Sequence, residues 1–276
     1  MSRNSDRLGG PVPASDPTPQ AVDQLFNFVV PTEFIDLPSK GRFYPSGHPL
    51  HGEETIEIKH MTAKEEDMLT SKTLLKKGVA LERVIDSLIV DRRIKAKSLL
   101  VGDRNAIIIG IRLHAYGPEY KTTVGCPSCQ EKSEYSFSVS ESNIFYGEEV
   151  EEVTANDDGT FTTTLPVFKL STTFRLLTGY DEDLLQNKRK VGSDTYETNI
   201  SSILKKMLVS VEGHDDPRAI DKLIEHITSR DSRHLRNSYK KVAPNIDLTQ
   251  LFECGNCSFS GDLEVPLNPE FFWPDR

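Results

Sequence analysis

The sequence predicts an α+β protein: helical lobes with short β segments and two Cys-x-x-Cys knuckles joined in one zinc site. Three observations predict this class. All four cysteines fall in two Cys-x-x-Cys pairs, at 126–129 and 254–257. Several longer segments carry apolar residues at helical spacing, and several short segments alternate apolar with polar residues as strands do. With 276 residues, the chain has material for one large or two small domains.

The four cysteines are the candidate metal ligands. A Cys-x-x-Cys turn places two sulfurs on one side, so two such turns face to face offer the tetrahedral thiolate cage that zinc prefers. The pairs lie about 125 residues apart (254 − 129), farther than in a compact zinc ribbon, and packing or free thiols, iron–sulfur ligation and disulfides remain alternatives. We hypothesise one structural Zn²⁺. Its ligands would be Cys126, Cys129, Cys254 and Cys257.

The segments beside each pair read as strands. Residues 121–124 and 135–139 flank the first pair, and residues 251–252 and 262–265 flank the second. Each knuckle should therefore form the tip of a short hairpin. A redox dithiol fits less well, because neither pair stands where a strand enters a helix.

Composition divides the chain into three parts. Residues 1–30 form a flexible N-terminal tail and arm, because the first 20 are rich in Pro, Ser, Asp, Gly and Thr and have almost nothing to bury. Residues 31–145 would form an N-terminal lobe with the first knuckle. Residues 146–276 would form a C-terminal lobe with the second.

The first lobe begins with a proline-bracketed loop at 34–45 and a strand at 55–59. A helix should start at Thr62, where Glu65 completes a capping box, and end before Gly78. A second helix is predicted at 81–89. A third should follow Asp103 as its N-cap and lie in the core, because five of the next ten residues are isoleucine or leucine. His114 would end that helix.

The second lobe combines a β segment with helices. Alternating residues predict strands at 161–165 and 167–177. Four helices should follow: from Asp181 as cap to Lys188, then 196–211, 217–229 and 232–242.

Charge and hydropathy limit the function classes. The net charge is −9 and the isoelectric point near 5.4, which opposes a general nucleic-acid role. A basic run at 92–97 and an acidic run at 148–158 are interpreted as solvated segments. No apolar run is long enough to cross a bilayer, and residues 1–14 lack a signal-peptide core, so we expect a cytoplasmic protein without a membrane partner.

Catalytic motifs are missing from the sequence. No phosphate-binding loop, nucleophile elbow or His-Glu-x-x-His motif occurs. His48, His51 and His60 lie close in sequence, but their spacing puts no pair on one face. A closed four-thiolate site leaves no position for a substrate. We therefore expect a binding or scaffold protein and no enzyme.

Three motifs in different parts of the chain are informative together. The first is Leu-Pro-Ser-Lys-Gly at 37–41 with Phe-Tyr-Pro at 43–45, and the second is Leu-Leu-Thr-Gly-Tyr-Asp-Glu at 176–182. The third is the final Cys-x-x-Cys followed by Val-Pro at 265–266 and Phe-Phe-Trp-Pro at 271–274. This combination resembles the baseplate hub family of T-even-like contractile-tailed phages. The resemblance spans roughly residues 31–274.

This resemblance implies a hub component or a hub assembly chaperone that contacts other baseplate hub or tail proteins. Such a protein would act in the host cytoplasm during assembly or in the tail baseplate of the virion. The candidate partner contacts combine aromatics with prolines; the alternative is that they close the protein's own core. They are Leu37, Pro38, Lys40, Phe43, Tyr44, Phe271, Phe272 and Trp273. The competing hypothesis is a zinc-ribbon nucleic-acid-binding protein with the 92–97 run on phosphate.

Overall fold

The computed structural model describes residues 29–187, 200–265 and 269–272. The chain divides into two units, Met1–Pro31 and Thr32–Arg276. The predicted tail and arm lie outside the described residues except for Val29 and Val30. Apart from Pro31, both predicted lobes fall within the second unit, which also holds both cysteine pairs.

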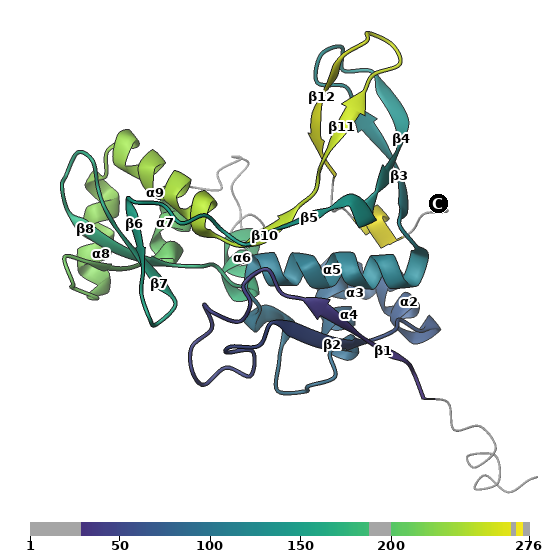
Figure 1. Ribbon diagram of the computed structural model, residues 1–276, viewed down its shortest axis with the longest axis horizontal. Helices are drawn as coiled ribbons and strands as arrows, with labels where there is room; N and C mark the ends of the chain where they lie inside the picture. Colours follow the sequence, from purple (N-terminus) through teal and green to yellow (C-terminus); the bar gives the residue numbers. More distant parts are fainter. Residues whose placement is uncertain (1–28, 188–199, 266–268, 273–276) are drawn as a thin grey trace, which may run out of the picture. The chain divides into compact units, whose positions relative to one another are not determined.

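An antiparallel strand pair and a long helix form the first half of this unit. Its elements are β1 (Thr32–Asp36), β2 (Thr55–Lys59), α2 (Ala63–Thr70), α3 (Lys72–Lys77), α4 (Ala80–Leu88), the 3-10 turn η1 (Ala96–Ser98) and α5 (Val101–Tyr116). Strand β1 pairs with β2, and α5 packs on this pair (Figure 1). The isoleucines of α5 are buried, as predicted.

Two predictions for these helices need correction. The helix expected from Thr62 to Gly78 is two helices, because the chain takes an extended conformation at Ser71; its capping box and its left-handed Gly78 end are as predicted. Asp103 is not the N-cap of α5. The helix begins two residues earlier, and Asp103 instead turns into the core to accept hydrogen bonds from another segment.

A four-stranded antiparallel sheet lies in the second half, in the order β6-β7-β8-β9. Its strands are β6 (Val153–Ala155), β7 (Thr160–Thr164), β8 (Ser171–Arg175) and β9 (Leu208–Val211). The helices are α6 (Gly179–Asn187), α7 (Ile200–Met207), α8 (Pro217–His226) and α9 (Ser229–Val242). With α2 to α5 they make eight α-helices in the described residues.

Several boundaries in this half differ from the prediction. The strand expected at 167–177 is limited to 171–175, the helix expected at 217–229 ends at residue 226, and the helix expected at 232–242 begins at residue 229. The largest difference concerns the helix before β9. The helix expected at 196–211 ends at Met207, and its last four residues form β9, which pairs with β8. Residues 208–211 read Leu-Val-Ser-Val, and β-branched side chains suit an edge strand once a partner strand is present. The sheet therefore overrides the helical periodicity. Residues 196–199, and the predicted helix end at Lys188, lie outside the described residues.

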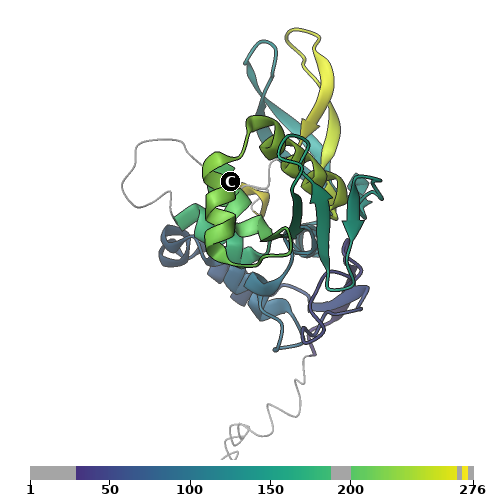
Figure 2. The same ribbon diagram turned by 90° about the vertical axis from the view of Figure 1, so that its left-hand side faces the viewer.

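Short β pairs join the two halves of the chain. The knuckles stand on two hairpins: β3 (Glu119–Gly125) with β4 (Lys132–Ser138), and β11 (Thr249–Glu253) with β12 (Ser260–Glu264). Strand β5 (Asn143–Phe145) pairs with β10 (Asn245–Asp247). Two 3-10 turns complete this region of the chain: η2 (Val139–Glu141) follows β4, and η3 (Pro269–Phe272) comes after β12. Both hairpins point the same way, side by side, in both views (Figures 1 and 2).

Candidate metal centre

The four cysteine sulfurs meet between the tips of the two hairpins. The Sγ of Cys126 lies 3.6 Å from that of Cys257, and the Sγ of Cys129 lies 3.8 Å from that of Cys254. All four sulfurs lie within 4.8 Å of one another. A tetrahedral Zn²⁺ with Zn–S bonds of about 2.3 Å spaces its sulfurs about 3.8 Å apart. The distances of 3.6 and 3.8 Å therefore match the spacing that the ion requires.

Each knuckle has the same backbone turn. In the first, the N–H of Gln130 donates to the carbonyl of Cys126 over 2.9 Å; in the second, the N–H of Ser258 donates to the carbonyl of Cys254 over 3.2 Å. Both Gln130 and Ser258 are left-handed, with φ of 60° and 57°. This repeated geometry turns both sulfurs of each pair toward the other hairpin.

The thiols differ in exposure and in acidity. The first cysteine of each pair is buried and the second is exposed. The backbone N–H groups of Cys257 and Asn256 lower the pKa of Cys254 to about 7. The N–H of Phe259 lowers the pKa of Cys257, but the neighbouring sulfurs raise it more, to about 11. Four thiolates this close repel one another, so they ionise together only around a cation.

The sulfur spacing also distinguishes a metal site from a disulfide. All four cysteines are free, and the 3.6 Å between the sulfurs of Cys126 and Cys257 is far longer than the bond of about 2.05 Å in a disulfide. A divalent ion with four thiolates would be closed to substrate, and the donor set suits structural zinc. These residues fit the ion: Cys126 and Cys129 would bind it from one hairpin, Cys254 and Cys257 from the other.

Contacts below the cysteines also join the hairpins. The Tyr135 ring lies 5.0 Å from that of Phe252, and its hydroxyl donates to the carbonyl of Leu251 over 3.0 Å. Gln250 accepts from the N–H of Ser138 and donates to its carbonyl, over 3.2 and 2.6 Å. These contacts hold the two hairpins in register, so the metal site is prearranged by protein contacts.

Most of the predicted partner contacts lie in the core. Leu37 and Tyr44 are 1% and 3% exposed, Phe271 and Phe272 are 1% and 3% exposed, and Pro38 is also buried. In this structure they close the protein's own core, which was the open alternative, and they form no exposed docking surface. Two of the set remain partly exposed, Lys40 and Phe43. Trp273 lies outside the described residues.

The first proline motif is held by a buried carboxylate. Asp103 accepts from the N–H and hydroxyl of Ser39, over 2.9 and 2.6 Å, and from the hydroxyl of Tyr44 over 2.8 Å. The Tyr44 hydroxyl in turn accepts from the N–H of Leu100. Burial raises the pKa of Asp103 although these donors lower it, and burial raises the pKa of Tyr44 well above its ordinary value. This motif ties loop 37–45 to the start of α5.

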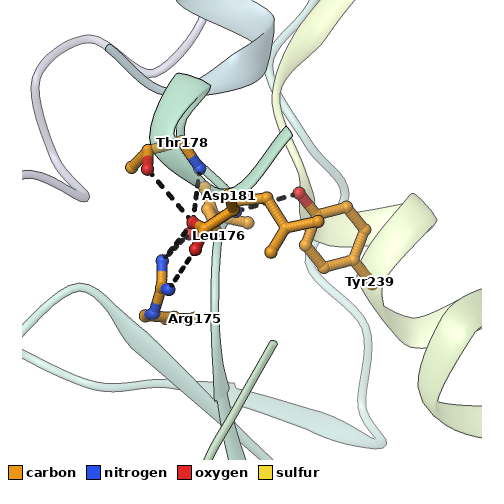
Figure 3. A network of polar contacts seen from close by, with 6 residues as sticks. Arg175, Leu176, Thr178, Asp181 and Tyr239 are labelled. Carbon is orange, nitrogen blue, oxygen red and sulfur yellow. Dashed lines mark hydrogen bonds and ion pairs between the residues drawn. The ribbon is translucent and has the colours of Figure 1, made fainter. Parts of the chain in front are cut away.

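The second motif surrounds the start of α6 (Figure 3). Both carboxylate oxygens of Asp181 accept from the Arg175 guanidinium over 2.8 Å, and one also accepts from the N–H and hydroxyl of Thr178 over 3.0 Å. Asp181 is thus the third residue of a capped helix start, not the cap predicted. The hydroxyl of Tyr239 accepts from the N–H of Leu177, which ties α9 to the same turn.

We expect Asp181→Asn to cost about 1–3 kcal/mol of unfolding free energy at pH 7, because Arg175 is partly exposed and water screens part of the pair. Burial raises the pKa of Asp181, but hydrogen bonds from Arg175 and Thr178 lower it by a larger amount. Its folded-state pKa is therefore below the ordinary value. That contribution is present above the unfolded pKa and lost as pH falls through the folded pKa. Urea unfolding of both proteins at pH 7 and pH 3 should show the difference shrinking; an equal difference at both would contradict it.

Comparison with models of known protein families places the motifs in one family. Residues 31–273 match the model described as T4 bacteriophage base plate protein. This chain belongs to that family. The match covers both cysteine pairs, the motifs at 37–45 and 176–182, and the last motif as far as residue 273. It confirms the resemblance to a T4-like baseplate protein. Searches of curated proteins and of solved structures give no match.

Two of the four cations in the basic run of this baseplate protein form ion pairs. Arg93 forms an ion pair with Asp91, and the Lys97 ammonium lies 3.3 Å from Glu82 and 2.8 Å from Asp183. Charges paired in this way are poor contacts for phosphate. Over the described ranges, the baseplate protein has no helix of the length and apolar character needed to span a membrane.

Proposed function

We propose that this baseplate protein is a component of the baseplate hub, or a chaperone for hub assembly, and that it acts through protein–protein contacts and catalyses no reaction. Its family membership over residues 31–273 carries the proposal. It would act in the host cytoplasm during assembly and in the tail of the virion. The four-thiolate site supports a scaffold role, because a closed zinc site shapes a protein and leaves no position for a substrate.

The partner-binding surface would be the groove between loop 38–43 and the acidic segment. The groove has a volume of about 960 Å³. Phe43 and Phe161, whose rings lie 5.1 Å apart, line it, and the ammonium of Lys40 lies 4.4 Å from the centre of the Tyr146 ring. Tyr146 is 50% exposed. The lining also includes a second cation, Arg42, and four carboxylates: Glu148, Glu149, Glu151 and Asp157.

These features favour one kind of occupant. The lining combines aromatic rings with more carboxylates than cations, which complements an extended segment that carries an apolar anchor between basic residues. We propose that another baseplate protein of the same phage supplies that segment. The remaining exposed candidates, Lys40 and Phe43, would then contact it, while their buried neighbours position them.

We expect Tyr146→Ala to weaken this complex at least about tenfold, because an exposed tyrosine at the centre of an interface contributes more than about 1.4 kcal/mol. Tyr180→Ala is the matched control, since Tyr180 is similarly exposed, at 53%, but lies on α6 outside the groove. The measurement is the dissociation constant for each baseplate protein of the phage, purified and immobilised in turn. Equal affinity of both variants would reject the groove, and no binding by the wild type would reject the hub role.

A further inference from the structure

A second group of metal-ligand side chains lies at the edge of the first half of the fold. Glu33 on β1, His60 just after β2 and His114 in the last turn of α5 each place one ligand atom within 4.8 Å of the others. The three come from separate elements, and none is near the cysteines in sequence. They are clear of the groove lining as well.

The packing of α5 on the strand pair explains why they meet. Ile35 of β1 packs so closely on Gly110 of α5 that a Cβ at Gly110 would lie 2.3 Å from its Cδ1. Glu33 is two residues before Ile35 in the strand, a step of about 6.6 Å, and His114 is four residues after Gly110 in the helix, a step of about 6 Å. The step from Ile35 to Glu33 and the step from Gly110 to His114 are nearly equal in length and lead to the same edge of the strand pair. Glu33 therefore lies close to His114.

The register of the strand pair adds the third ligand. Glu33 is paired with Ile58, and Ile58 is buried, at 2% exposure. His60 is two residues farther along, so it shares the face of Ile58. The row of side chains that faces α5 thus changes from isoleucine in the core to histidine and glutamate at the edge.

The distances match those of a three-ligand metal site. The Nε2 of His60 lies 3.4 Å from the Oε1 of Glu33. Zn–N and Zn–O bonds of about 2.0–2.1 Å in a tetrahedron space their ligand atoms about 3.3–3.4 Å apart. The rings of His60 and His114 meet edge to face with centroids 5.5 Å apart, and one ring nitrogen of His114 lies within 4.8 Å of the ligand atoms of both other residues.

The imidazole nitrogens have capacity for a ligand. Among the described residues, His60 has Glu33 as its one hydrogen-bond partner, and the His114 ring makes no hydrogen bond. The other two histidines of the sequence cluster differ: His48 bonds to Ser98, and His51 bonds to the carbonyl of Tyr44. The structure therefore separates His60 from its sequence neighbours.

We propose that Glu33, His60 and His114 bind a divalent late first-row metal ion, of which Zn²⁺ is the reference case, with water at the remaining position. Two neutral imidazoles and one carboxylate suit Zn²⁺ and its neighbours, whereas Ca²⁺ and Mg²⁺ prefer oxygen ligands alone. This site would be open to solvent, unlike the closed cysteine site. It would link β1, the end of β2 and the end of α5.

The test uses full-length protein without a histidine tag, loaded with one equivalent of Zn²⁺. Isothermal titration calorimetry with further Zn²⁺ should show a second equivalent binding. We expect His60→Gln with His114→Gln to weaken that second binding at least about tenfold, because two of three ligands are removed. His226→Gln is the matched control, since His226 is an exposed histidine on another helix, α8. This substitution should leave the affinity for the second equivalent of Zn²⁺ unchanged.

Two further measurements make the outcome decisive. The thermal melt of the one-zinc forms should coincide for wild type and variants, because the replaced side chains lie at the protein surface. NMR signals of the His60 and His114 imidazoles should shift on the second equivalent. The proposal is overturned if no second equivalent binds, or if binding is the same in the double variant. It is equally overturned if the control loses as much affinity.

Discussion

Removing the Zn²⁺ that the four cysteines would bind should loosen the two hairpins and lower the melting temperature by at least about 10 °C. Structural zinc contributes apparent binding energies of about 10–16 kcal/mol in small peptides, and here protein contacts supply part of the joining. A loss of about 3–5 kcal/mol in a domain of this size corresponds to roughly that shift. Elemental analysis should give about one Zn²⁺ per chain, and melting with and without a chelator should give the shift.

The change should be local as well as large. Hydrogen exchange should rise at the knuckles, 125–132 and 253–260, and much less at α5, which packs elsewhere. Cys254→Ser should reproduce the effect of the chelator. Ser128→Ala is its matched control, because Ser128 lies exposed in the same turn and contacts Cys126 through its backbone N–H, which the substitution keeps. Protein with four titratable thiols, no metal and an unchanged melt would contradict the zinc site.

The cysteine site was predictable because its signal is local. Each Cys-x-x-Cys pair fixes its own turn, and the alternating residues beside it fix a hairpin, so both halves can be read separately. The left-handed Gln130 and Ser258 carry no such signal, since neither is glycine. The meeting of the pairs across about 125 residues depends on contacts such as Tyr135 with Phe252, which appear only in the folded chain.

The helix in the core was also predictable, and its first turn was not. Five isoleucine and leucine residues within ten predict a buried helix, because they cover most of its surface. Asp103 before them has the sequence position of a cap, and local sequence cannot tell a cap from a carboxylate recruited by a distant loop. Similarly, β9 follows from pairing with β8, which outweighs the helical spacing of residues 208–211.

Contacts between elements explain the remaining differences. The aromatics of loop 37–45 and of η3 were candidates for partner binding because sequence shows that they are apolar and not which way they point. Glu33, His60 and His114 were invisible as a group for a related reason. Their nearness follows from the crossing of α5 over a strand pair, and sequence spacing does not report such a crossing.

The second large effect is expected at Asp103. Replacing it with alanine should cost about 3–5 kcal/mol of unfolding free energy, because the N–H and hydroxyl of Ser39 and the hydroxyl of Tyr44 lose their shared acceptor inside the core. Asp36→Ala is the control: Asp36 is an exposed aspartate on β1, and its replacement should change stability by less than about 0.5 kcal/mol. Urea unfolding at pH 7 measures both. A cost below about 1 kcal/mol at Asp103 would contradict the role.

The contribution of Asp103 to stability should depend on pH in the opposite direction to that of Asp181. Burial raises its pKa in the folded state, so the pH-dependent part of its contribution is fully present below the unfolded pKa and is lost as pH rises through the folded pKa. The unfolding free energy of the wild type should therefore exceed that of Asp103→Asn by more at pH 4 than at pH 7. Its excess over that of Asp181→Asn should instead grow as pH rises. The difference follows from the partners: hydroxyls and an N–H surround Asp103 in the core, whereas a guanidinium cation faces Asp181. If both differences in unfolding free energy changed in the same direction with pH, the assignment of one carboxylate to neutral donors and the other to a cation would be wrong.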